Sequence, residues 1–150
     1  MKEREKYHQG KFHPQNPQKY KGDINNIIYR SSWELEFMRY CDRREDILEW
    51  GSEEFFIPYF DPTTERVRRY FPDFYMKVKE SDGKISNYII EIKPKKQTIR
   101  PQKTNKKRNK TYINEVLTYE KNIAKWKAAE KFCDDKMLIF KIITEKDLGL

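Results

Sequence analysis

Residues 70–93 read YFPDFYMKVKESDGKISNYIIEIK and predict a hairpin of two β-strands. Polar and apolar residues alternate over residues 73–78, which is typical of a strand that buries one face. An aspartate-glycine pair in the middle of the segment predicts a tight turn, and residues 86–92 form the second strand. Asp73, which begins the first strand, and Glu91, near the end of the second, should therefore lie at the same end of a sheet.

Asp73, Glu91 and Lys93 are the strongest candidates for catalytic residues in the chain. Glu91 and Lys93 are two positions apart and share a face of their strand. Neighbouring carboxylates repel each other unless a cation lies between them, and Mg²⁺ takes one or two carboxylates, water and phosphate oxygens as ligands. The backbone carbonyl of Ile92 can supply a further oxygen, and Lys93 can orient or help to deprotonate a water molecule. We expect phosphodiester hydrolysis with Mg²⁺, for which Mn²⁺ should substitute.

The elements around this hairpin predict a single-domain α/β fold with a central mixed sheet. A helix should run from an N-cap at Ser31 to about Asp42. Residues 47–50 and 55–60, separated by Gly51, are interpreted as one bulged strand. The further expected elements are a short strand at 66–70, a long helix at 112–133 and a last strand at 137–143.

The length of 150 residues fits one domain, with residues 1–22 as a basic extended arm and residues 23–150 as the domain proper. No run of 18 apolar residues or hydrophobic leader is present, so we expect a soluble cytoplasmic protein without a membrane partner. The two cysteines, Cys41 and Cys133, lack the spacing of a zinc site and are interpreted as reduced core residues.

The net charge of +8 is concentrated in a few segments. Residues 93–110 contain nine basic residues and no acid, with two prolines that disfavour regular structure. Like charges at this density repel one another unless an anion neutralises them, which favours a DNA partner over a merely solvated loop. The residues expected to contact DNA are Lys95, Lys96, Gln97, Arg100, Lys103, Lys106, Lys107, Arg108 and Lys110.

Pro72-Asp73 with Glu91-Ile92-Lys93, preceded by a helix that bears Glu34, resembles the PD-(D/E)XK nuclease superfamily. The predicted element order is similar to the αβββαβ core of that superfamily, a restriction-endonuclease-like fold. The resemblance implies that Asp73 and Glu91 are the metal ligands and that Lys93 is the catalytic lysine. It also implies that Glu34 is a helix-borne acid of the site, and Gln97 resembles a glutamine that some members place after the motif.

The resemblance extends over nearly the whole chain, because residues 10–23, 29–34 and 70–74 are similar to the head-completion nuclease family of T-even bacteriophages. This implies a DNA endonuclease of virion assembly, with little sequence specificity, that cleaves packaged DNA so that filled heads can join tails. Additional exonuclease action is left open. Phage head, portal or neck proteins are the implied partners, and a homodimer would be one simple way to cut both strands.

Several residues have a structural interpretation beside the functional one. Asp73 and Glu91 could be ordinary exposed carboxylates of strands, and Glu34 could serve only as the N3 residue of a capping box. Residues 66–69 carry three arginines that either join the basic loop or offset nearby glutamates. Asn122 and Lys125, three residues apart on the long helix, are interpreted as helix surface, with a place at the site as the alternative.

Two other functions remain open at the level of sequence. A structural assembly protein could keep the nuclease fold and bind DNA or a portal without cutting, although it would not need Asp73, Glu91 and Lys93 together. A nuclease acting on junctions or transposon ends could be built on the same core and would differ only in its substrate.

Overall fold

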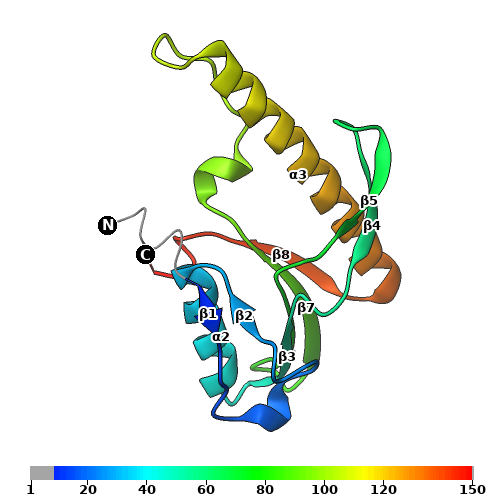
Figure 1. Ribbon diagram of the computed structural model, residues 1–150. Coiled ribbons are helices and arrows are strands. Elements are labelled where there is room, and N and C mark those ends of the chain that lie inside the picture. Colours follow the sequence, from blue (N-terminus) through cyan, green and yellow to red (C-terminus); the bar gives the residue numbers. More distant parts are fainter. Residues whose placement is uncertain (1–8, 150) are drawn as a thin grey trace.

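A four-stranded sheet with the strand order β3-β6-β7-β8 forms the centre of the molecule (Figure 1). The computed structural model describes residues 9–149. The strands are β3 (Ile47–Ser52), β6 (Phe74–Lys79), β7 (Ile85–Ile92) and β8 (Ile139–Ile143). The first three are antiparallel neighbours, whereas β8 runs parallel to β7. The predicted hairpin and the mixed sheet are thus confirmed, and with them the α/β fold.

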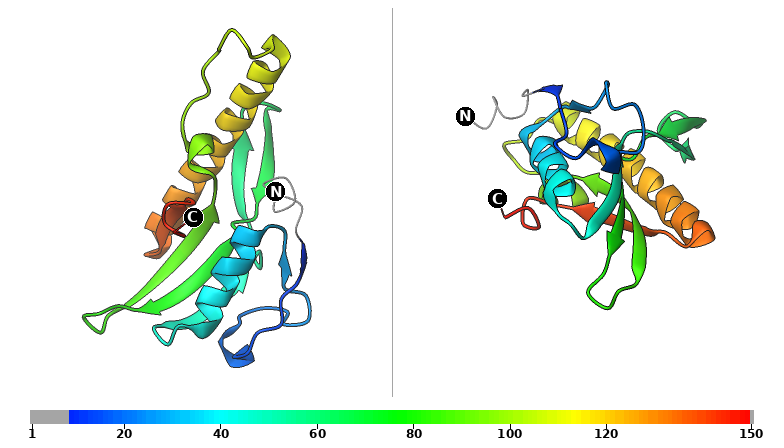
Figure 2. Two further views of the ribbon diagram at one scale, coloured as in Figure 1. Left: turned by 90° about the vertical axis from the view of Figure 1, so that its left-hand side faces the viewer. Right: turned by 90° about the horizontal axis from the view of Figure 1, so that it is seen from below.

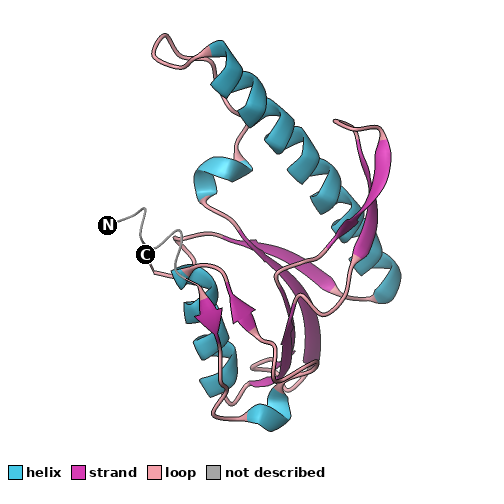
Figure 3. Ribbon diagram, viewed as in Figure 1, coloured by secondary structure: helices cyan, strands magenta, loops and turns pink. Residues whose placement is uncertain are grey.

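Helices α2 (Ser32–Arg43) and α3 (Asn109–Lys136) pack on this sheet through two separate hydrophobic clusters (Figure 3). Ile90 and Ile92 of β7 join the cluster of α2, in which Trp50 is fully buried and contacts the ring of Phe74. Phe140 of β8 joins the cluster of α3. Because side chains alternate along a strand, the two helices cover different faces of the sheet.

The expected bulged strand over residues 47–50 and 55–60 is wrong, because these residues form two strands in different sheets. β3 ends at Ser52, and Glu53 follows with a φ of 52°, a left-handed conformation that turns the chain out of the sheet. β4 (Ile57–Asp61) then pairs with β5 (Arg66–Tyr70) in a separate hairpin that packs on α3. In Figure 2 this hairpin lies beside α3 in both views.

The helices follow the prediction at their starts and ends to within a few residues. The Oγ of Ser31 accepts the Glu34 N–H at 3.1 Å, as expected for the N-cap of α2. α3 is longer than predicted and ends where Met137 adopts a left-handed conformation. The basic loop is less irregular than its two prolines suggest, since residues Lys95–Thr98 form the short 3-10 helix η2 and α3 begins before the loop was expected to end.

Residues 10–22, expected as part of the extended arm, pack against the domain. β1 (Gly10–Lys11) pairs with β2 (Ile28–Tyr29), and a short 3-10 helix, η1 (Pro17–Lys19), follows β1. The ring of Tyr20 is buried and meets that of Trp50 edge-on at 4.8 Å. The buried carboxylate of Asp42 accepts the backbone N–H groups of residues 15 and 16. Residues 1–8 of the predicted arm lie outside the described residues.

The two cysteines are free and buried, which confirms their interpretation as core residues. Over residues 9–149, no helix combines the length and the apolar character needed to cross a bilayer.

Candidate active site

The register of β6 and β7 places Asp73 beside Glu91. Phe74 faces Ile90 across the ladder, so one step further along the antiparallel pair Asp73 comes opposite Glu91. The backbone N–H of Ile92 donates to Asp73 Oδ2 at 2.8 Å. The main chain of β7 therefore holds the carboxylate of Asp73 next to Glu91, the acidic residue of that strand.

Glu91 carries an unusual buried charge. Its residue surface is only 4% exposed, and its Oε1 has no hydrogen-bond donor within the described residues. Its Oε2 lies 3.8 Å from the Nζ of Lys93, an ion pair beyond hydrogen-bond distance. A buried carboxylate oxygen without a donor is unfavourable, and a cation at this position would satisfy it.

The carboxylates of this sheet end also repel one another. Burial raises the pKa of Asp73 well above its usual value of 3.8, and the charges of Glu91 and Glu34 raise it further. Burial likewise raises the pKa of Glu34, with a contribution from Glu91. Protonation and cation binding are the two ways in which such a cluster can lose its excess negative charge.

The donor set fits a hard divalent cation that keeps part of its shell open. Among residues 9–149, no group of three or more His, Cys, Asp or Glu side chains is gathered as a ready-made metal centre. Two carboxylates with a free buried oxygen between them match Mg²⁺, which keeps several waters and is commonly completed by substrate phosphate. The residues are thus compatible with the expected metal, with Asp73 and Glu91 as its ligands.

Glu34 belongs to the capping box of α2, and its place at the site stays a prediction. One of its oxygens lies 3.4 Å from the backbone N–H of Arg30 and the other 3.4 Å from the Oγ of Ser31, as a residue of the helix start would do. Its charge also acts on Asp73, which places it near the carboxylate pair. The cap fixes the start of α2 and thereby holds the Glu34 carboxylate at the edge of the candidate site.

The interpretation of Asn122 and Lys125 as helix surface is wrong. Asn122 is buried, and burial lowers the pKa of Lys125, with Lys93 lowering it further and Glu91 opposing. The Nζ of Lys125 lies 5.7 Å from the centre of the Tyr70 ring and 5.9 Å from that of Tyr59. Lys125 therefore contributes a second positive charge beside Lys93.

Tyr70 was not singled out from the sequence, although it lies three residues before Asp73. Its hydroxyl is buried beside the carboxylate of Glu91, although no hydrogen bond of ordinary geometry reaches it from residues 9–149. Burial, and after it the charge of Glu91, raises the pKa of this hydroxyl. The signal available in the sequence was the pair Tyr70-Phe71 directly before the Pro72-Asp73 motif, but only the packing of Tyr70 against α3 brings it to the acids.

The basic loop divides into paired and unpaired cations. Arg100 and Lys107 pair with Glu120 and Glu115 of α3 at 2.7 and 2.8 Å, and Lys93 pairs with Glu91. No acidic side-chain partner within the described residues is found for the other six, which are Lys95, Lys96, Lys103, Lys106, Arg108 and Lys110. Gln97 is exposed at the end of the site where the loop leaves β7.

The arginines of β5 do not offset the glutamates that were considered for them. Arg68 pairs instead with the buried Asp61 at 3.2 Å, which also lies 3.8 Å from Lys121 of α3. Arg69 lies over the ring of Phe56. The ion pair of Asp61 with Lys121 ties the hairpin to the long helix, and no acidic partner is found for Arg66 among the described residues.

Comparison with known proteins agrees with this geometry. The model of the TnsA-like endonuclease N-terminal family matches residues 44–145, which include the two strands of the carboxylate pair and all of α3. The chain belongs to this endonuclease family, and the protein is a nuclease of the PD-(D/E)XK kind. The head completion nuclease of enterobacteria phage T4 is 41% identical to it over 142 residues, which cover 93% of this chain and 92% of that protein.

The repulsion at the site predicts that Asp73→Asn stabilises the metal-free protein. Since the folded-state pKa of Asp73 is raised, its contribution to stability is most favourable below pH 3.8 and is lost as the pH rises through the folded value. Asparagine keeps an oxygen for the Ile92 N–H and removes the charge. Urea unfolding in EDTA should show an advantage for the variant of about 1–2 kcal/mol at pH 8 that shrinks towards pH 4.

Mg²⁺ should then stabilise the wild type and not the variant. A pH-independent difference between the two proteins, or equal stabilisation by Mg²⁺, would contradict the assignment of Asp73 to the carboxylate pair.

Proposed function

We propose that this nuclease is a Mg²⁺-dependent DNA endonuclease of phage head completion. The observation that carries the proposal is the pair of the half-buried Asp73 and the buried Glu91, whose Oε1 has no donor among the described residues, followed by Lys93 and a strongly basic loop. An acidic pocket collects the cation, and adjoining cations collect the phosphate backbone.

In this proposal Asp73, Glu91 and the backbone carbonyl of Ile92 hold the metal. A bound Mg²⁺ would polarise the scissile phosphate and lower the pKa of a coordinated water. Lys93 orients the attacking water, which gives up a proton to solvent as its oxygen forms a new bond to phosphorus. The bond from phosphorus to one bridging oxygen breaks, and that oxygen takes a proton from solvent. Lys125 stabilises the charge that gathers on the phosphate oxygens. Glu34 lies at the edge of the site and adds negative charge to it.

The biological role is inferred from the phage relative. That protein is described as a head completion nuclease, and the likeness runs over nearly the full length of both chains. We infer that this protein acts in the host cytoplasm on packaged DNA during head-tail joining, with head, portal or neck proteins as its neighbours. DNA should be cut with little sequence preference, because phosphate contacts position an enzyme without reading bases.

Two alternatives are less well supported. A non-catalytic assembly protein would have no use for a carboxylate pair whose mutual repulsion opposes folding. A transposon-end nuclease is compatible with the TnsA-like family match, which covers residues 44–145. The phage protein is the better guide, since its likeness also covers most of the chain before residue 44.

Nicking of supercoiled plasmid tests the catalytic assignment. With Mg²⁺ or Mn²⁺ the wild type should nick, and EDTA should abolish the activity. Asp73→Asn, Glu91→Gln and Lys93→Met should each lower the rate at least about 100-fold, since each removes a charge from the reacting centre. Asp135→Asn, an exposed carboxylate on α3, is the matched control and should keep full activity. Nicking by Asp73→Asn at the wild-type rate would refute the site, and inactivity of the wild type would favour the structural alternative.

Lys125 gives a second test of the site. Lys125→Met should lower kcat about 10-fold to 100-fold, because it removes one positive charge near the scissile phosphate. Lys127→Met, two residues away on the exposed side of α3, should leave the rate unchanged. Lys125→Arg should recover part of the lost activity. Equal rates for the two methionine variants would show that Lys125 takes no part in the reaction.

The basic loop predicts a strong dependence of DNA binding on salt. If the six unpaired cations each neutralise one phosphate, log K for duplex DNA should fall with log [salt] with a slope of about −5. Replacing Lys103, Lys106 and Lys110 together by glutamine should reduce the slope by about 3 units. The measurement is a salt titration by fluorescence anisotropy in EDTA. A slope near zero would reject the loop as the DNA contact.

A further inference from the structure

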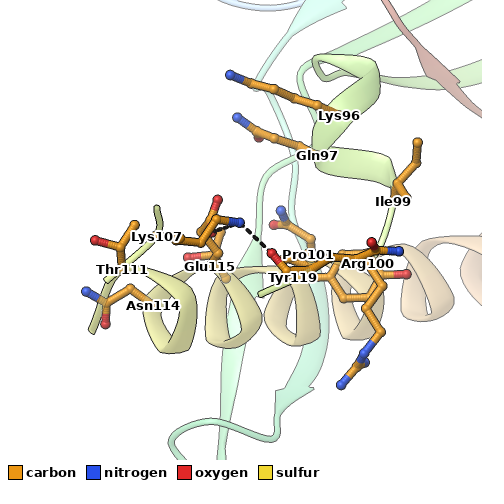
Figure 4. A pocket seen from close by; sticks show the side chains of 13 residues that line it. Lys96, Gln97, Ile99, Arg100, Pro101, Lys107, Thr111, Asn114, Glu115 and Tyr119 are labelled. Atoms are coloured by element: carbon orange, nitrogen blue, oxygen red, sulfur yellow. Dashed lines mark hydrogen bonds and ion pairs between the residues drawn. The ribbon is translucent and has the colours of Figure 1, made fainter. Parts of the chain in front are cut away.

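A groove of about 670 Å³ lies between the loop that leaves β7 and the N-terminal half of α3 (Figure 4). Lys96 and Gln97 extend over it from η2, while Thr111, Asn114 and Tyr119 line it from α3. Pockets of roughly 300–1,000 Å³ hold ligands of drug-like size, so this groove has room for one or two nucleotides.

Four polar, uncharged side chains line the groove from α3. Thr111, Asn114, Thr118 and Asn122 follow one another at intervals of three or four residues and so share one face of α3. Their hydroxyl and amide groups can both donate and accept hydrogen bonds. Such a surface suits the edges of bases and sugars better than it suits an apolar peptide.

The charges around the groove favour an anion. Lys96, Arg100 and Lys107 all line it, and two of them are paired with acids of α3, Lys107 with Glu115 at 2.8 Å and Arg100 with Glu120 at 2.7 Å. Lys96 has no acidic partner within residues 9–149. A chain of phosphates along the rim would meet positive charge without competition from a free carboxylate of the lining.

The groove also offers a stacking surface. The ring of Tyr119 lies in the lining, with the guanidinium of Arg100 at 6.0 Å from the ring centre. Ile99 is 56% exposed on the opposite wall. Aromatic rings and guanidinium groups are the side chains on which unpaired bases stack, whereas the faces of bases in a duplex are already covered by their neighbours.

The groove leads to the proposed active site. The last residue of α3 that lines the groove is Asn122, and Lys125 follows within one helical turn. Lys125 is close enough to Lys93 and Glu91 for their charges to shift its pKa. On the opposite side, η2 begins two residues after Lys93. A strand lying in the groove would therefore continue into the carboxylate pair.

We propose that this groove binds an unpaired strand of DNA and guides it to the carboxylate pair, so that the preferred substrates are single strands and frayed or tailed ends. The inference rests on the proposed nuclease function and adds the form of the substrate to it. In this arrangement one base stacks on Tyr119 between the loop and α3, and the amide side chains of α3 contact the edges of that base. Lys96 and Arg100 contact the phosphates of the strand.

Binding of fluorescent oligonucleotides in EDTA, where cleavage is blocked, tests the groove apart from the chemistry. Tyr119→Leu should weaken binding of a 12-nucleotide single strand about 5-fold to 100-fold, since one base loses its aromatic partner. Binding of a blunt duplex should change less than about twofold, because stacked bases do not use the ring. Tyr119→Phe keeps the ring and should bind the single strand like the wild type.

Two further variants guard against misfolding. Ile99→Ala truncates an exposed loop residue of the groove and should weaken single-strand binding selectively, whereas Leu117→Ala, exposed on the same helix outside the groove, should have no effect. Equal losses for duplex and single strand, or no loss in Tyr119→Leu and Ile99→Ala, would overturn the proposal. Selective binding by a wild type that fails to cut with Mg²⁺ would instead refute the nuclease mechanism and leave the groove standing.

Discussion

The hydrogen bond from the Ile92 N–H to Asp73 is the contact on which the site depends, because it holds one carboxylate against another that is buried. This arrangement opposes folding, since burial and mutual repulsion both disfavour the charged forms. The rest of the core must outweigh it. The packing of α2 and α3 on the sheet provides that stabilisation and also removes water from the sheet end where the acids meet.

The distribution of charge follows from the same constraint. At the candidate site, Asp73 and Glu91 place negative charge at one end of β6 and β7, and positive charge adjoins it from Lys93 and from Lys125 on α3. The two aromatic rings beside Lys125 come from the β4-β5 hairpin, which the ion pairs of Asp61 join to α3. The hairpin is therefore a support for the site as well as a separate sheet.

The strand predictions succeeded where one periodicity was unambiguous and failed where a turn depended on backbone conformation. The alternation over residues 73–78 and 86–92 allowed one register only, and the structure has it. The separation of residues 47–52 from 57–61 depends on Glu53, a non-glycine residue in the left-handed region. No local sequence pattern predicts this backbone conformation. Partner choice among strands is a long-range property, so β4 and β5 could not be assigned to their own sheet from sequence.

The sequence by itself determined the kind of chemistry, because Asp73, Glu91 and Lys93 are near one another through the geometry of a single hairpin. The α/β class and the position of the basic loop also follow from local patterns and from composition. Only the tertiary structure decided that Tyr70 and Lys125 belong to the site and that the loop and α3 enclose a groove. Such residues are distant along the chain or ambiguous between core and surface, and it is packing on α3 that brings them together.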